Sequence, residues 1–270
     1  PWKDVDPREG TGVVHIAPGC GKEDFQLSKE VGLIALSPVN DEGVYVSGYA
    51  RLEGKSCQTV ADEIVAQLKE RNELLYDYMH LHSYPVCWRC KNELIFRLVG
   101  EWFIRSEEIR PRLIEAAAKV EWLPDYMGKR MEDWLNNMGD WCISRKRFWG
   151  LPLPFYPCPA CERLTVIGSR EEFNQLSDGA SQSLPELHRP WIDNIQITCS
   201  CGTKVSRISE VGDCWLDAGI VPYTTRGYFE NKPEWERWYP VEWICEMREQ
   251  IRLWFYSMLF MGVTLHNRSP

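Results

Sequence analysis

Short cysteine pairs are the residues of this sequence best suited to chemistry. Cys158 and Cys161 form a C-x-x-C motif, and Cys199 and Cys201 form a tighter pair that Gly202 follows. Such spacing lets two thiolates face one ion from a tight turn, and two pairs supply the four ligands of a tetrahedral zinc site. We therefore predict structural zinc at these four cysteines, with reduced, inert thiols as the alternative.

A third pair, Cys87 and Cys90, forms only half a site. We expect these two thiols to lie close together without a full metal site, because their partners would precede Pro1 in a longer chain. The total of eleven cysteines is odd, which argues against a complete disulfide framework. The scattered cysteines are expected to be small buried hydrophobic residues: Cys20, Cys57, Cys142, Cys214 and Cys245.

A glycine-rich segment over residues 10–24 contains a histidine and an acid, His15 and Asp24, that flank its loop. Glycine allows the backbone to approach a ligand closely. The segment therefore indicates either a small-molecule loop whose acid holds an ammonium group, or a glycine turn in which Asp24 caps a helix.

The elements that would position these residues follow from hydrophobic periodicity and capping signals. We expect strands over 11–16, 164–167 and 241–245, and helices over 24–30, 59–71, 251–265 and from an N-cap at Ser106. Residues 246–250 would then lie at the carboxyl end of a strand that leads into a helix, which is where open α/β sheets bind ligands.

Length and charge limit the class of protein. The 270 residues suffice for one large domain or two to three small ones, and 44% of them are hydrophobic, which excludes a wholly disordered chain. A net charge of −8 gives no general attraction to nucleic acid or anionic membrane. No apolar run approaches a membrane span, and we expect no signal peptide. Both ends suggest cuts through a longer protein.

Five segments together resemble the isoleucyl-tRNA synthetases, a family of class I enzymes, and the resemblance spans the whole chain. Residues 10–24 are similar to the G-T-G-x-V-H-x-A-P-x-x-G-x-x-D element of the family's editing domain. The other segments resemble the W-x-I-S-R-x-R-x-W-G signature, an isoleucyl-type segment, the D-x-W-F-D-S-G element and the E-G-x-D-Q-H-R-G-W-F element: 140–150, 185–193, 213–219 and 246–255.

The resemblance implies roles for named residues. In the editing pocket, Asp24 would anchor the α-ammonium of a mischarged amino acid and His15 would line the pocket. Glu246 would hold the amino group of isoleucine or its adenylate, and Trp215 and Trp254 would enclose the isoleucine side chain. Residues near the adenylate would be Met247, Glu249 and Gln250. The sequence departs from the family at Met247 for glycine, Glu249 for aspartate and Ile251 for histidine.

The resemblance also implies a mixed α/β fold in three parts. Residues 1–80 would be the C-terminal part of a β-rich editing domain, and 81–210 a connective region with a zinc ribbon over 158–201. Residues 211–270 would belong to a Rossmann-like catalytic domain with a parallel sheet. The implied cofactors are Zn²⁺ and, in the whole enzyme, ATP and Mg²⁺. The implied partners are tRNA(Ile), isoleucine and ATP, for a cytoplasmic monomer without a membrane.

The chain shows neither the H-I-G-H nor the K-M-S-K-S element of the family. We therefore expect a fragment of an enzyme that activates isoleucine, charges tRNA(Ile) and hydrolyses valyl-tRNA(Ile), while the fragment alone lacks ligase activity. The alternatives are a valyl- or leucyl-type fragment and a free-standing aminoacyl-tRNA deacylase.

A further alternative is a zinc-ribbon module that docks on RNA or protein, with basic residues that could contact a tRNA backbone: Lys129, Arg130, Arg145, Lys146 and Arg147. The opposing interpretation pairs these cations with nearby acids: Glu121, Asp125, Glu132, Asp133 and Asp140.

Overall fold

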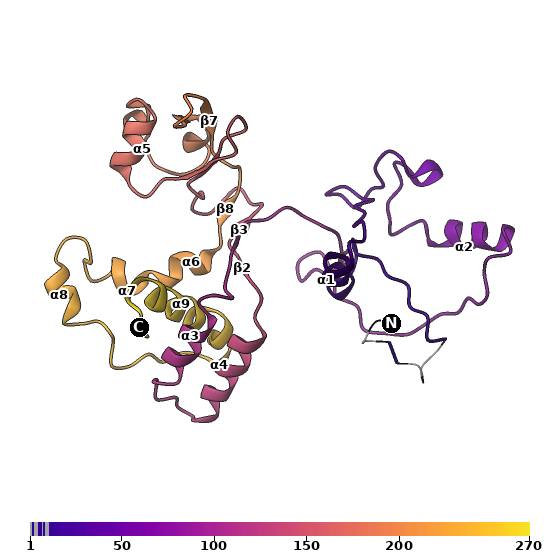
Figure 1. Ribbon diagram of the computed structural model, residues 1–270, viewed down its shortest axis with the longest axis horizontal. Helices are drawn as coiled ribbons and strands as arrows, with labels where there is room; N and C mark the ends of the chain where they lie inside the picture. Colours follow the sequence, from indigo (N-terminus) through magenta and orange to yellow (C-terminus); the bar gives the residue numbers. More distant parts are fainter. Residues whose placement is uncertain (1, 3–4, 7, 9–10) are drawn as a thin grey trace. The chain divides into compact units, whose positions relative to one another are not determined.

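Two units, residues 1–100 and 101–270, make up the chain in a computed structural model (Figure 1). The structure describes residues 2, 5, 6, 8 and 11–270, so Gly10, which opens the glycine-rich motif, lies outside the described residues.

The described residues of unit 1 form two α-helices, α1 (Lys22–Val31) and α2 (Ala61–Glu70), and one 3₁₀ turn, η1 (Ala50–Leu52). The helices predicted over 24–30 and 59–71 are confirmed. The strand predicted over 11–16 is wrong: the segment forms a turn and then an unpaired chain, with Val13 85% exposed. A strand needs a hydrogen-bonded neighbour, and none of the described residues of the unit provides one.

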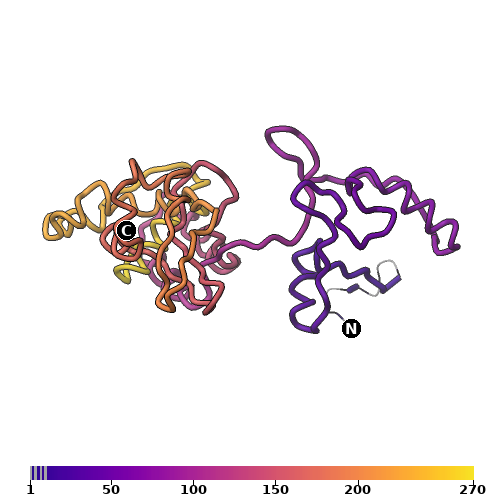
Figure 2. Tube along the Cα trace, turned by 90° about the horizontal axis from the view of Figure 1, so that it is seen from above, coloured from indigo at the N-terminus to yellow at the C-terminus, as the bar shows by residue number. Residues whose placement is uncertain are grey.

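Unit 2 has its main core between three helices, α3 (Arg110–Ala117), α4 (Tyr126–Asn137) and α9 (Trp254–His266). In Figure 2, the magenta and yellow parts of this unit lie in the same region, because residues far apart in the chain pack into one core. The predicted apolar helix is confirmed, although it begins at Trp254, because a 3₁₀ turn, η4 (Arg248–Arg252), precedes it.

Four small antiparallel sheets of two strands each occur among the described residues, so the fold is mixed α/β. The expected parallel sheet is not present there. The pairs are β1 (Phe103–Ile104) with β2 (Trp141–Cys142), β3 (Ser144–Arg145) with β8 (Val211–Gly212), β4 (Phe155–Pro157) with β5 (Leu164–Val166), and β6 (Gln196–Thr198) with β7 (Lys204–Ser206). The strand predicted over 164–167 is thereby confirmed as β5.

Unit 2 also contains several shorter helices: α5 (Arg170–Leu176), α6 (Cys214–Gly219), α7 (Val221–Thr224), α8 (Lys232–Glu236), η2 (Ala180–Ser183) and η3 (Trp191–Asn194). Three aromatic residues of this unit, Tyr223, Trp235 and Tyr239, form a small separate core.

Two local predictions in unit 2 are wrong. Ser106 is not an N-cap: it is buried, its amide donates to Asp140 Oδ1 at 2.9 Å, and the helix begins at Arg110. The strand predicted over 241–245 is absent. Trp243 in this segment is 69% exposed, and the described chain places no neighbouring strand beside it to pair with.

Helices α6 and α9 approach each other closely at Gly219. A Cβ added there would lie 2.9 Å from the backbone oxygen of Ser257 and 3.1 Å from Met261. We therefore expect Gly219→Ala to destabilise unit 2 by about 1–3 kcal/mol, the usual cost of overpacking. Urea denaturation would measure this, with Gly139→Ala as the control, because a Cβ at Gly139 meets nothing within 4 Å. Equal stabilities of the two variants would contradict the prediction.

Candidate functional site

Two hairpin turns bring four cysteines together. Cys158 and Cys161 lie in the turn between β4 and β5, and Cys199 and Cys201 lie in the turn between β6 and β7. The first turn is closed by the Cys158 amide, which donates to Arg163 O at 2.8 Å, and the second by the Cys199 amide, which donates to Thr203 O at 2.9 Å. We call residues 155–206 the cysteine lobe. Its own core includes Tyr156, Phe173, Ile192, Ile197 and Val205.

The sulfur atoms have the spacing of a tetrahedral metal site. Cys158 Sγ lies 3.6 Å from Cys201 Sγ, and Cys161 Sγ lies 3.7 Å from Cys199 Sγ. All four sulfurs lie within 4.8 Å of one another. A tetrahedral ion with metal–sulfur bonds of about 2.3 Å would separate its ligands by about 3.8 Å, whereas a disulfide needs about 2.05 Å. The residues therefore fit a metal ion and not a disulfide.

The turns also favour thiolate at part of the cluster. The hydroxyl and backbone amide of Thr203 lower the pKa of Cys201 to about 6. The backbone amide of Cys201 likewise lowers the pKa of Cys199. A metal ion binds cysteine as the thiolate, so a turn that stabilises negative sulfur prepares the site for a cation.

The pair Cys87 and Cys90 has the same kind of turn in unit 1. The Cys87 amide donates to Asn92 O and the Lys91 amide donates to Cys87 O, both at 2.8 Å, which repeats the pattern at Cys158. The backbone amides of Cys90 and Arg89 lower the pKa of Cys87. The described residues add no third or fourth ligand there.

In unit 2, Glu246 and Trp254 line one pocket of about 310 Å³. Three further tryptophans line the same pocket: Trp235, Trp238 and Trp243. Trp215 is not among the lining residues, so the structure brings together two of the three groups that the resemblance assigns to isoleucine. The pocket combines one carboxylate and one cation, Arg226, with aromatic walls. The carboxylate suits an ammonium group of a ligand, and the aromatic walls suit an apolar side chain.

The residues that follow Glu246 take different positions. Met247 is exposed, and Glu249 Oε1 accepts a hydrogen bond from Arg248 Nε at 3.2 Å. Gln250 Oε1 accepts from the backbone amide of Trp254 at 3.0 Å, so this side chain satisfies the first amide of α9. None of these three residues lines the pocket of Glu246.

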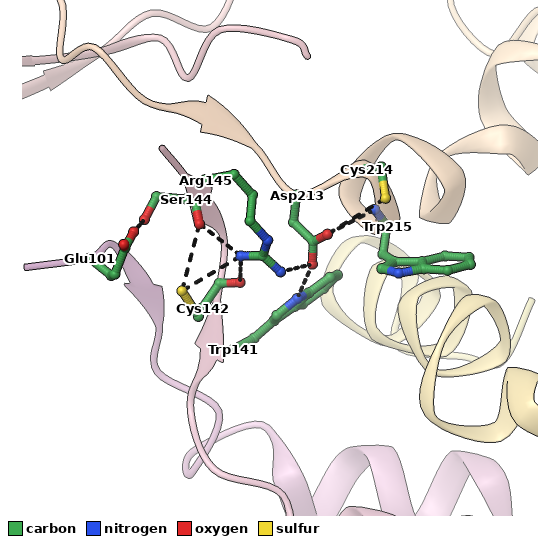
Figure 3. Close-up of polar contacts among 8 residues, drawn as sticks. All are labelled: Glu101, Trp141, Cys142, Ser144, Arg145, Asp213, Cys214 and Trp215. Atoms are coloured by element: carbon green, nitrogen blue, oxygen red, sulfur yellow. Dashed lines mark hydrogen bonds and ion pairs between the residues drawn. The ribbon is translucent and has the colours of Figure 1, made fainter. Parts of the chain in front are cut away.

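A buried carboxylate that the sequence analysis did not single out joins two of the motif segments (Figure 3). Asp213 is 4% exposed, and its Oδ2 lies 3.0 Å from both Arg145 Nη2 and Trp141 Nε1. Arg145 and Trp141 belong to the segment 140–150, and Asp213 opens the segment 213–219. The sequence did contain one sign of this contact, because one motif carries a cation, Arg145, and the other carries an acid, Asp213.

The same junction bears on the interpretation that pairs the five basic residues with acids near them in sequence, and it argues against that interpretation. Arg145 pairs with Asp213 and with none of the five acids near it in sequence. Within the described chain, the other four cations make no ion pair within 4.0 Å: Lys129, Arg130, Lys146 and Arg147.

The glycine-rich segment of unit 1 uses Asp24 to shape its own loop. Asp24 Oδ2 accepts the backbone amide of Ala17 at 2.9 Å, while His15 is exposed. No hydrogen bond joins His15 to Asp24 in the part of the chain that the structure describes. Gly19 permits a close chain approach, since an added Cβ would lie 1.8 Å from Leu36 O.

Comparison with known proteins gives the family. The model of the class I tRNA synthetases (I, L, M and V) matches residues 12–270. The chain therefore belongs to the class I tRNA synthetases.

Relatives of the chain include isoleucine–tRNA ligases. That of Methanopyrus kandleri is 37% identical over 98% of this chain and 26% of its own length. Those of Sulfolobus acidocaldarius and Archaeoglobus fulgidus are each 38% identical, over 98% and 100% of this chain and 25% and 26% of their own lengths. The chain thus spans about a quarter of these relatives.

A solved complex of the leucyl-tRNA synthetase (LeuRS) of Agrobacterium radiobacter K84 with tRNA and LeuAMS also matches. The match covers 98% of this chain and 26% of the solved chain, with a TM-score of 0.35 and 16% identity.

None of the helices described in this chain has the length and apolar character that crossing a membrane requires.

Proposed function

We propose that this chain contributes the isoleucine-binding wall of an isoleucine–tRNA ligase, which activates isoleucine with ATP and Mg²⁺ and transfers it to tRNA(Ile). The observation that carries the proposal is the pocket shared by Glu246 and Trp254, in a chain whose relatives are isoleucine–tRNA ligases. The carboxylate of Glu246 holds the α-ammonium group by charge-assisted hydrogen bonds, and the aromatic walls exclude water from the branched side chain.

The proposal divides the chain by task. Residues 1–80 belong to the editing domain, in which Asp24 anchors the ammonium group of valine on misacylated tRNA and His15 lines the pocket. Residues 81–210 form the connective region, and residues 211–270 belong to the catalytic domain. A second, hydrolytic site is needed because one methylene in an apolar pocket discriminates by only about 1–3 kcal/mol.

The proposal also assigns zinc to the cysteine lobe, with Cys158, Cys161, Cys199 and Cys201 as its ligands. Support comes from the four thiols and from their tetrahedral spacing. Zinc here is structural, since four protein ligands leave no open position for a substrate.

Pyrophosphate exchange in an isoleucine–tRNA ligase that carries this sequence tests the proposed function. We expect isoleucine to support exchange, with a kcat/KM at least about tenfold above that of valine, the low end of the discrimination that one methylene provides. The kcat/KM for leucine should be lower than that for valine, because the leucine side chain branches one carbon further from the α-carbon. Preference for valine or leucine would instead favour the valyl or leucyl enzyme.

The 270 residues alone should give only background exchange. They contain neither the H-I-G-H nor the K-M-S-K-S element, whose histidines and lysine would stabilise charge on the reacting phosphate of ATP. The measurement is the same assay on the purified chain, and robust exchange would contradict the assignment of the nucleotide-binding groups to other segments.

A further inference from the structure

The buried Asp213 lies at the point where the cysteine lobe joins the helices of unit 2. Strands β3 and β8 pair antiparallel, with Arg145 opposite Val211, and they carry the chain out to the lobe and back. Asp213 follows β8 directly and receives the guanidinium of Arg145 and the indole N–H of Trp141, each at 3.0 Å (Figure 3).

The partners of Asp213 are themselves fixed. Arg145 Nη1 donates to the carbonyl oxygens of Cys142 at 2.9 Å and Ser144 at 2.7 Å. The ring of Trp141 packs against two aromatic residues of α9, with centroid distances of 5.3 Å to Tyr256 and 5.2 Å to Phe260. The guanidinium and the indole therefore hold the carboxylate against a rigid part of the core.

From Asp213 the contacts continue into α6. Asp213 Oδ1 accepts the backbone amide of Trp215 at 3.4 Å and thereby caps the helix. At the other end of the helix, Ala218 O accepts the indole N–H of Trp254 at 2.8 Å. The short helix thus carries Trp215 near its start and holds the ring of Trp254 near its end.

We propose that Asp213, held by Arg145 and Trp141, is a positioning residue that sets helix α6 and, through it, the ring of Trp254 in the isoleucine pocket. The inference rests on the proposed function, because that function gives Trp254 its ligand. Asp213 touches no substrate. Its effect is on the shape of the apolar wall, so it acts on the affinity for the amino acid and on the choice between isoleucine and valine.

Asp213→Asn in the full-length enzyme tests the proposal, because it keeps the shape of the side chain and removes its charge. We expect the KM for isoleucine in pyrophosphate exchange to rise about tenfold, the usual effect of weakening a hydrogen bond to a charged group. The kcat for each titrated active site and the KM for ATP should stay unchanged. The ratio of kcat/KM for isoleucine over valine should fall.

Asp193→Asn is the matched control. Asp193 also joins two partners, Arg189 Nε at 2.7 Å and Arg207, but it lies in the cysteine lobe. We expect this variant to leave the KM for isoleucine unchanged. An equal rise in both variants would show a general loss of packing and would overturn the proposal.

A second pair of variants keeps the test valid if Asp213→Asn does not fold. Arg145→Met removes the cation and should raise the KM for isoleucine, whereas Arg145→Lys keeps the charge beside Asp213 and should restore most of the affinity. A normal KM in Arg145→Met, or a lower kcat with normal KM, would overturn the proposal. If the unmodified enzyme shows no exchange with isoleucine, the proposed function itself fails, which is a distinct result.

Discussion

Replacing Cys161 with serine should remove the metal and unfold the cysteine lobe. Cys161 is exposed, so the substitution leaves no cavity, and an inert thiol at this position would tolerate it within about 0.5 kcal/mol. As one of four ligands, however, it contributes to a metal-binding free energy of about 10–16 kcal/mol in small zinc sites, which is also folding free energy. The lobe has only a small core of its own to replace that contribution.

Two measurements check this prediction. Metal analysis should find one zinc fewer per chain in Cys161→Ser, and hydrogen exchange should show lost protection confined to residues 155–206. Cys20→Ser is the matched control, because Cys20 lies outside the cluster and is also exposed, contrary to the expectation that it is buried. Full zinc content and unchanged exchange in Cys161→Ser would show that these thiols bind no metal.

Replacing Glu246 with glutamine should weaken isoleucine binding in the full-length enzyme. The change keeps the size of the side chain but removes the negative charge that faces the ammonium group. A hydrogen bond to a charged group contributes about 1.5–3 kcal/mol, so the KM for isoleucine should rise roughly 10- to 100-fold. Pyrophosphate exchange at varied isoleucine concentration measures this effect.

Glu242→Gln is the control for the Glu246 variant, since Glu242 is exposed on the same segment and does not line the pocket. Hydrolysis of valyl-tRNA(Ile) should be normal in both variants, because the proposal places that reaction at Asp24 in unit 1. Equal isoleucine KM values in the two variants would contradict the role of Glu246.

Local signals in the sequence predicted the parts of the fold that local interactions determine. The periodicity of Val60, Ile64 and Leu68 predicted α2, and cysteine spacing predicted the cluster, because two tight turns suffice to orient each pair. The apolar periodicity over 251–265 predicted α9, although η4 moves its start to Trp254.

Elements that depend on distant partners could not be predicted in this way. The apolar run over 241–245 has the composition of a strand, but a strand forms only beside another strand. The contact of Asp213 with Trp141 joins residues 72 positions apart, and no local periodicity indicates it.

A crystal structure of the full-length enzyme with a non-hydrolysable isoleucyl-adenylate analogue tests the central claim most directly. We predict that the ammonium group lies within hydrogen-bond distance of the Glu246 carboxylate, with the branched side chain against Trp254. A complex in which the ammonium group binds elsewhere, with Glu246 free of the ligand, would contradict the claim that this chain provides the isoleucine site.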